Sequence, residues 1–189
     1  MKFLELRNKI GDNLFTFEDV VKYFALENET TIKQQLSRFI KSKLIFPIKK
    51  GLYCFDIEKV DPLFLANLLY QPSYISGITA LFFYGLVPDI PQITVSVTTV
   101  TKKIFHLYLG DFIYFKIKNE LYFGFETIKV KENYVRIATK EKALLDFIYL
   151  NKIKEIKDLR IEWRKINIDL FKNYLKSYPF WIKKIIWPI

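Results

Sequence analysis

Residues 62 to 88 carry no charged side chain. So long an uncharged run must be buried, either in a protein core or in a membrane. Gln71-Pro72-Ser73 interrupts it near the middle, and the apolar piece that follows, residues 75–87, is only about two-thirds of the ~20 residues that a membrane-spanning helix needs. The run therefore predicts two buried helices of a water-soluble core. The first residues, MKFLELRNKIGDN, also lack the apolar run of a secretory signal, so we expect a cytoplasmic protein.

Near residues 56–62 a strand-like pattern gives way to a helical one, which predicts two domains, residues 1–59 and 60–189. Both are basic, with 11 Lys and Arg against 8 Asp and Glu in the first and 19 against 12 in the second. The net charge of +10 fits a polyanionic partner such as nucleic acid, although a lysine-rich genome would give the same bias. The single cysteine excludes an internal disulfide and a cysteine-based zinc site. We expect no metal and no cofactor.

The first domain reads as three helices. One is expected from Phe3 to Gly11, a second begins at Thr16 as N-cap, and a third follows Glu29 with Thr30 or Thr31 as its cap. At about 100° per residue, the third helix gathers its apolar residues on one side and polar or basic ones on the other. The apolar stripe consists of Ile32, Leu36, Phe39 and Ile40.

A β-hairpin is expected directly after these helices. Residues 44–48 and 52–55 are two short strand patterns, and Lys49-Lys50-Gly51 forms the turn between them, where Gly51 can adopt positive φ. Three helices followed by a hairpin with a basic tip predict a winged helix-turn-helix that binds double-stranded DNA. The alternative is the same fold used only for protein contacts. The candidate DNA-binding residues are Thr30, Thr31, Lys33, Gln34, Ser37, Arg38, Lys41, Lys49 and Lys50.

The second domain is expected to be α+β, with a mostly antiparallel sheet and C-terminal helices. Two helical patterns come first, the second capped by Ser76, and Thr139 caps a later one over residues 140–150. Helical patterns at 168–178 and 179–187 close the chain. β-branched and aromatic residues with partial alternation mark the strands, at 92–99, 103–109, 111–118, 121–130 and 133–138.

Three short motifs, spread over nearly the whole chain, resemble those of the AbiEi-type antitoxins of bacterial abortive-infection systems. They are a G-x-Y wing ending, a Y-I-S-x-x-[ST]-A-L-x-x-x-G-L segment, and an A-x-x-E-K-A-L-x-D helix. The residues here that match are Gly51 and Tyr53; Tyr74, Ile75, Ser76, Thr79, Ala80, Leu81, Gly85 and Leu86; and Ala138, Glu141, Lys142, Ala143, Leu144 and Asp146.

The resemblance implies a transcriptional autorepressor, bound to its own promoter at inverted repeats, that also neutralises a nucleotidyltransferase-like toxin with or without a stable complex. After Leu150 the family pattern is lost, and the basic residues there, with 10 Lys and Arg against 4 Asp and Glu from Lys152 on, are a second candidate site. We expect several to share helical faces and to counter the toxin, although a solvated basic face is an equal alternative. These residues are Arg160, Arg164, Lys165, Lys172 and Lys176.

No residues with an evident catalytic role emerge from the sequence. The only histidine, His106, lies in a strand pattern without a nearby nucleophile, and Cys54 reads as a small core residue. Glu141 and Asp146 point some 140° apart on one helix, so we expect a helix-dipole role for the first and a surface or capping role for the second.

The alternative function is a winged-helix targeting subunit of a nucleic-acid-processing enzyme. A pair of carboxylates with a lysine on adjacent strands would favour it, and the candidates are Asp111, Glu120, Glu126 and Glu132. The ending PFWIKKIIWPI, with Trp181 and Trp187, gives a weak signal for attachment to a membrane surface, and we expect it to pack on protein instead.

Overall fold

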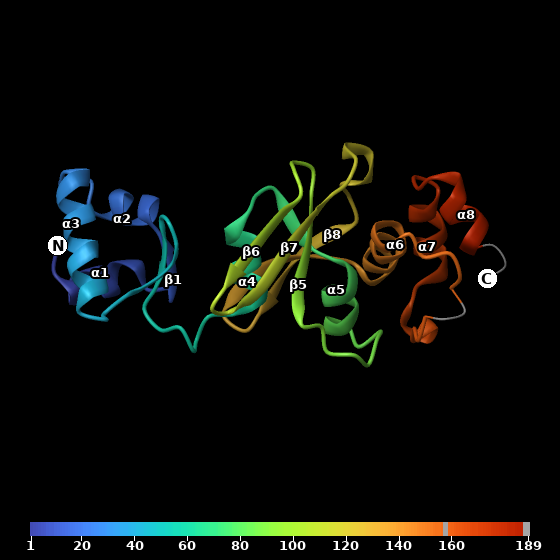
Figure 1. Cartoon of the computed structure of the whole chain (residues 1–189), viewed down its shortest axis with the longest axis horizontal. Coiled ribbons are helices and arrows are strands. Elements are labelled where there is room, and N and C mark those ends of the chain that lie inside the picture. The colour runs from blue at the N-terminus through green and yellow to red at the C-terminus, as the bar shows by residue number, and fades with distance from the viewer. Residues whose placement is uncertain (157–158, 187–189) are drawn as a thin grey trace. The chain divides into compact units, whose positions relative to one another are not determined.

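The computed structural model describes residues 1–156 and 159–186, and Trp187 therefore lies outside the described residues. The chain forms two compact units, Met1–Asp61 and Pro62–Ile189 (Figure 1). This boundary falls two residues after the division expected from the sequence.

The Met1–Asp61 unit places three helices around a small antiparallel sheet. The sheet has the strand order β1-β3-β2, so the strand that precedes α2 pairs with the second strand of the hairpin. The elements, in chain order, are α1 (Phe3–Ile10), β1 (Leu14–Thr16), α2 (Phe17–Tyr23), α3 (Glu29–Lys41), β2 (Phe46–Lys49) and β3 (Leu52–Cys54).

The helix starts follow from local capping. Thr16 caps α2 as predicted, because its hydroxyl accepts the Asp19 N–H at 3.1 Å while the Asp19 carboxylate accepts the Thr16 N–H at 2.8 Å. The prediction that Thr30 or Thr31 caps α3 was wrong. Asn28 is the cap, and its side-chain oxygen accepts the Thr30 N–H at 2.8 Å, so both threonines belong to the first turn.

One core fills the first unit. Ile32 and Leu36 of α3 are buried as predicted, whereas Phe39 and Ile40 are only half-buried. The buried apolar side chains come from every helix and from the strands or the residues that flank them: Leu6, Ile10, Phe15, Val20, Phe24, Ile32, Leu36, Ile45 and Phe55.

The Pro62–Ile189 unit is an α+β domain, as predicted. Its elements are α4 (Pro62–Leu69), β4 (Ser73–Ile75), α5 (Gly77–Phe83), β5 (Ile93–Thr98), β6 (Lys103–Leu107), β7 (Gly110–Lys116), a 3₁₀ turn η1 (Asn119–Leu121), β8 (Phe125–Val130), β9 (Asn133–Ala138), α6 (Lys140–Asn151), a 3₁₀ turn η2 (Trp163–Lys165), α7 (Ile168–Leu175) and α8 (Phe180–Ile186).

The sheet of this unit is mixed, with antiparallel pairs in the majority and two parallel pairs that were not expected. Its order is β6-β7-β5-β4-β9-β8, in which β5–β7 and β4–β9 pair parallel and the other three pairs are antiparallel. Both parallel pairs join strands that are not consecutive in the chain. A strand pattern gives no direction or partner, so the sequence could not show them.

The uncharged run supplies the centre of this unit. Two of its segments are the expected helices α4 and α5, but Ser73–Ile75 between them forms β4, a fully buried strand in the middle of the sheet. α5 packs against β5 and α6, and α6 in turn packs against α7 (Figure 1). Within residues 1–156 and 159–186, no helix has both the length and the apolar character needed to cross a membrane.

Candidate nucleic-acid interface and a buried polar network

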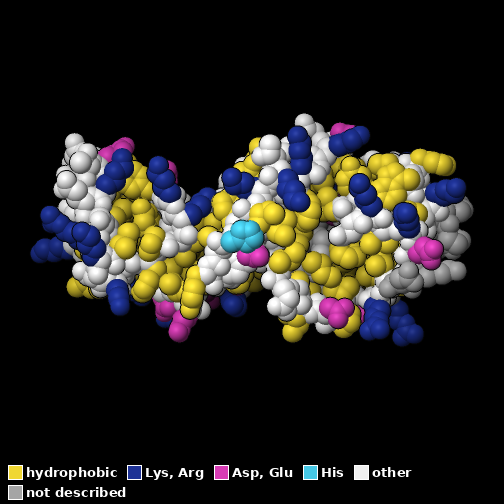
Figure 2. Space-filling view, in the orientation of Figure 1, with side chains coloured by type: hydrophobic (Ala, Val, Ile, Leu, Met, Phe, Trp, Pro, Cys, Tyr) yellow, Lys and Arg dark blue, Asp and Glu magenta, His cyan; other side chains and the backbone are white. Residues whose placement is uncertain are grey.

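The outward face of α3 carries the first seven candidate residues, and all seven are exposed: Thr30, Thr31, Lys33, Gln34, Ser37, Arg38 and Lys41. Ile32 and Leu36 anchor the opposite side of the helix in the core. Arg38 and Lys41 form no ion pair with any described residue. Figure 2 shows Lys and Arg side chains gathered around α3 at the surface of this unit.

The hairpin turn is bonded to the start of α2, which in turn contacts α3. The Phe17 N–H, at the start of α2, donates to the Gly51 carbonyl at 2.9 Å, which fixes the turn against that helix. Lys33 of α3 places its ammonium 5.0 Å from the centre of the Phe17 ring and 3.2 Å from Glu29. Gly51, Phe17 and Lys33 thus connect the hairpin tip to α3.

The two lysines at the hairpin tip differ in environment, and only Lys50 belongs to the turn, because Lys49 is the last residue of β2 and pairs with Leu52. Lys50 is exposed, whereas Lys49 is half-buried beside a bulge in the β2–β3 register, and this burial lowers the pKa of its ammonium group. Gly51 has φ of 80°, a conformation that a side chain would strain. The hairpin tip therefore presents one solvated cation and one that is held close to the protein.

The second candidate set is spread over two segments of the larger unit. All five side chains are exposed, but Arg160 lies in irregular chain and Arg164 and Lys165 in η2, so only Lys172 and Lys176 lie on or at the end of a helix, α7. Lys165 donates to the Gly85 carbonyl at 2.7 Å. The expectation of shared helical faces therefore holds for Lys172 and Lys176 alone.

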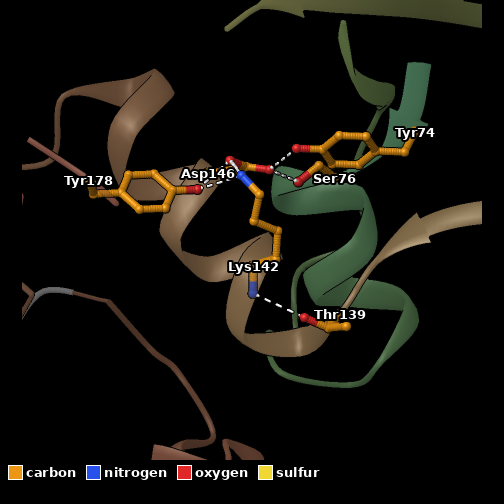
Figure 3. A network of polar contacts seen from close by, with 6 residues as sticks. All are labelled: Tyr74, Ser76, Thr139, Lys142, Asp146 and Tyr178. Carbon is orange, nitrogen blue, oxygen red and sulfur yellow. Dashed lines mark hydrogen bonds and ion pairs between the residues drawn. The ribbon is translucent and has the colours of Figure 1, made fainter. Parts of the chain in front are cut away.

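The larger unit also contains a polar network that is closed to solvent. Asp146 of α6 is fully buried and accepts four hydrogen bonds (Figure 3). Its Oδ2 accepts from the hydroxyls of Tyr74 at 2.9 Å and Ser76 at 2.7 Å. Its Oδ1 accepts from the Tyr178 hydroxyl at 2.7 Å and from the Lys142 ammonium at 2.5 Å. Lys142, also fully buried, donates to the Tyr178 oxygen at 2.6 Å as well.

Burial shifts the titration of this network. It lowers the pKa of Lys142, an effect that the Asp146 carboxylate partly offsets. It raises the pKa of both Tyr74 and Tyr178, and the negative charge of Asp146 raises each further. Both carboxylate oxygens already accept two hydrogen bonds each, so the network holds helices and strands together and offers no free base.

These positions correct two expectations from the sequence. Asp146 has neither a surface nor a capping role, and Ser76, although it is the N-cap residue of α5, makes no side-chain cap and directs its hydroxyl to Asp146. Thr139 does cap α6, as predicted, by accepting the Lys142 N–H at 3.4 Å. The available signal was the i, i+4 spacing of Lys142 and Asp146, which places a lysine and a carboxylate side by side on one face of the helix.

The residues weighed for catalysis are mostly accounted for by local contacts. His106 is an exposed strand residue whose Nδ1 lies 2.9 Å from an Asp111 oxygen. Cys54 is buried, and desolvation raises the pKa of its thiol to about 11. Glu120 and Glu132 each lie within 4 Å of a surface lysine.

Glu126, the last of the four carboxylates, lies near the Tyr84 hydroxyl, whose pKa is raised by burial and further by the charge of Glu126. It lines a pocket of about 270 Å³ together with Glu141, Lys140 and Lys165. Glu141 is itself nearly buried, with an oxygen that accepts the Asn167 N–H at 2.8 Å. That bond fixes the start of α7 against α6, so Glu141 contributes a tertiary contact beyond the expected helix-dipole role.

Comparison with known proteins adds no family to this description. No family model matches the chain, and no curated protein sequence matches it significantly. In the described part of the chain, no three His, Cys, Asp or Glu side chains come close enough to bind a metal ion together.

Proposed function

We propose that this protein is a DNA-binding transcriptional repressor with a winged helix-turn-helix in Met1–Asp61. The order α1-β1-α2-α3-β2-β3, with the three strands in one antiparallel sheet, is the element order of that fold. The observation that carries the proposal is the exposed polar and basic face of α3, in the same unit as a hairpin whose tip carries two lysines.

The chemistry of the two surfaces assigns them different tasks. α3 enters the major groove, where Arg38 and Gln34 have the donor groups that read guanine and adenine edges. Lys49 and Lys50 contact phosphates from the wing, and such contacts strengthen binding to all sequences alike. Lys33, held between Glu29 and the Phe17 ring, adds a positive charge at the edge of the α3 face that meets α2.

We further propose that the protein is an antitoxin that represses its own promoter and neutralises a nucleotidyltransferase-like toxin. The support is the resemblance of its three motifs to AbiEi-type antitoxins. The buried network gives two of those motifs a physical meaning, because Tyr74 and Ser76 of one motif bond Asp146 of the other. Neutralisation is assigned to the exposed Arg160, Arg164, Lys165, Lys172 and Lys176.

DNA binding is tested by fluorescence anisotropy with the full chain, a duplex from upstream of its own gene and a scrambled duplex. Arg38→Ala should weaken binding to the upstream duplex by about 1–3 kcal/mol and reduce the preference over the scrambled one. The Lys49→Ala/Lys50→Ala variant should weaken binding to both duplexes equally. The slope of the logarithm of the binding constant against the logarithm of the salt concentration should become shallower by about 0.9 for each phosphate that the wing no longer neutralises.

The matched control is Lys9→Ala/Lys59→Ala, which removes the same charge from surface lysines that are paired with Glu5 and Asp56. It should bind both duplexes almost as the unmodified protein does. Equal losses in the wing variant and in this control would show that only net charge matters and would contradict the proposal.

Neutralisation is tested by growth of cells that express the neighbouring toxin gene. Replacing the five basic residues by alanine should abolish rescue and leave binding to the upstream duplex intact, whereas Arg38→Ala should do the reverse. Loss of rescue in Arg38→Ala, with rescue retained in the variant that lacks the five basic residues, would assign neutralisation to the first unit.

The alternative, a targeting subunit of a nucleic-acid-processing enzyme, has one observation in its favour. Glu126 and Glu141 line one pocket with Lys140 and Lys165, a combination of carboxylates and lysines that metal-dependent nucleases use. Incubation of labelled DNA and RNA with the protein and Mg²⁺ decides between the two. Cleavage that Glu126→Gln abolishes would establish the alternative, and we expect none.

A further inference from the structure

A second pocket in the Pro62–Ile189 unit combines lysines with aromatic rings. It has a volume of about 630 Å³, within the range of small-molecule sites. Its walls come from the turn between β5 and β6, the end of β7, the end of α6 with the chain that follows, and α8. The lining residues are Lys102, Phe115, Lys116, Tyr149, Leu150, Lys152, Lys154 and Trp181.

The charge in this pocket is of one sign. Among the residues that the structure describes, four lysines line it and no acidic residue does. All four are exposed, and none forms an ion pair within residues 1–156 and 159–186, whereas Lys118 and Lys129 elsewhere in the unit pair with Glu120 and Glu132. Like charges that converge without a counter-ion favour an anionic ligand.

The aromatic side chains give the pocket a flat, apolar wall. The rings of Tyr149 and Trp181 are nearly parallel, with an interplanar angle of 21° and centres 6.3 Å apart. Trp181 is 37% exposed and can therefore stack a further planar group. On the other side, the Lys102 ammonium lies 5.3 Å from the centre of the Phe115 ring.

The pocket lies at the carboxyl ends of β5 and β7, a place in a sheet where ligands often bind. β5 and β7 are parallel neighbours in register, with Thr98 opposite Lys116 at their carboxyl ends. Pockets in α/β sheets recur at the carboxyl ends of parallel strands, because the connections there leave a crevice. Lys102 and Lys116 both lie at this end.

We propose that this pocket binds a nucleoside triphosphate. Its base stacks on Trp181 beside Tyr149, and its phosphates lie among Lys102, Lys116, Lys152 and Lys154. A planar apolar surface next to several lysines that form no ion pair with any described residue matches a nucleotide, which has a base at one end and three or four negative charges at the other. The site is separate from α3 and the wing, so the proposal does not depend on DNA binding.

The test is isothermal titration of the full chain with ATP, GTP, CTP and UTP, alongside tripolyphosphate and adenosine. We expect saturable 1:1 binding of at least one nucleotide, and weaker binding of tripolyphosphate and adenosine, because each supplies one half of the recognition. Trp181→Ala and Lys116→Ala/Lys152→Ala should each weaken nucleotide binding about tenfold.

Matched controls remove equivalent groups outside the pocket. Phe180→Ala deletes an exposed ring next to Trp181 in the chain, and Lys118→Ala/Lys129→Ala removes two lysines of the same unit. Both should bind the nucleotide as the unmodified protein does, and Trp181→Phe should retain most of the affinity. Thermal melting confirms that each variant is folded.

Four results would overturn the proposal. One is the absence of binding by any nucleotide at millimolar concentration. Another is equal weakening by the pocket and control lysine variants. The third is tight binding of a single-stranded oligonucleotide at this pocket with none of mononucleotides, which would make it a nucleic-acid groove. If the lysines only offset the partial negative charge at the end of α6, their replacement lowers the melting temperature and leaves nucleotide binding unchanged, which also contradicts the proposal.

Discussion

Replacing Asp146 by alanine should remove much of the stability of the larger unit. The substitution leaves the Lys142 ammonium buried without its counter-ion and takes the acceptor from the hydroxyls of Tyr74, Ser76 and Tyr178. Removal of one partner of a buried ion pair costs about 3–5 kcal/mol, because the other charge stays in a medium that solvates it poorly. Domains of this size are stable by only about 5–15 kcal/mol.

The loss is measured by urea unfolding followed by tryptophan fluorescence. All three tryptophans of the chain lie after residue 62, so the signal reports this unit alone. Asp146→Asn keeps the volume and one acceptor oxygen and should lose less than the alanine variant. The double variant with Lys142→Ala should lose about 0.5–3 kcal/mol less than the sum of the two single variants, as expected for groups in direct contact.

The control is Glu132→Ala, which removes a carboxylate whose side chain is 93% exposed and lies 3.9 Å from a lysine. It should change the free energy of unfolding by no more than about 0.5 kcal/mol. A loss below about 1 kcal/mol for Asp146→Ala would refute the reasoning, because it would mean that water or another group replaces the carboxylate at little cost.

Three further outcomes are expected. The free energy of unfolding should fall by about 1.4 kcal/mol per pH unit for each of Tyr74 and Tyr178 as the pH rises above about 10, because the unfolded chain ionises while the raised pKa keeps the folded hydroxyls protonated. Urea titrations at alkaline pH measure this slope, and Tyr178→Phe should make it shallower by the share of one tyrosine, about 1.4 kcal/mol per pH unit. Cys54, whose pKa is raised to about 11, should react with a thiol reagent at pH 8 only as fast as the first unit opens, and a rate equal to that of a free thiol would contradict its burial. Gly124→Ala should destabilise the larger unit by about 1–3 kcal/mol in the same urea assay, since Gly124 has φ of 69° and an added methyl would lie 3.1 Å from side chains of α6 and α7. Gly11→Ala, with similar φ and open space, should cost the first unit only the backbone strain of about 1 kcal/mol, measured by far-UV circular dichroism because that unit has no tryptophan.

Local signals in the sequence predicted much of the fold. The caps at Thr16 and Thr139 and the hairpin turn at Gly51 depend on residues a few positions apart, and the structure has each of them. The two strands that sequence patterns missed, β1 and β4, have three residues each, too few for alternation to show.

The polar network was not predictable by the same means. Asp146 and Lys142 are charged, and charged side chains in proteins are mostly exposed to solvent. We therefore expected α6 to turn Asp146 outward. The structure surrounds that helix on nearly all sides over its first half. Partners for Asp146 lie 70, 72 and 32 residues away in the chain, and no local pattern links them.

The place of Tyr178 between α7 and α8 has a consequence for synthesis on the ribosome. Tyr178 is made 32 residues after Asp146, which takes roughly 2–6 s at ordinary rates of translation. During that interval the sheet and α6 can assemble, but the carboxylate and ammonium lack one of their hydroxyl partners. The nascent domain should therefore stay loosely packed around α6 until α7 and the residues that follow it emerge. Chaperone binding and protease sensitivity of stalled chains should change at that point and not when the last strand of the sheet is complete.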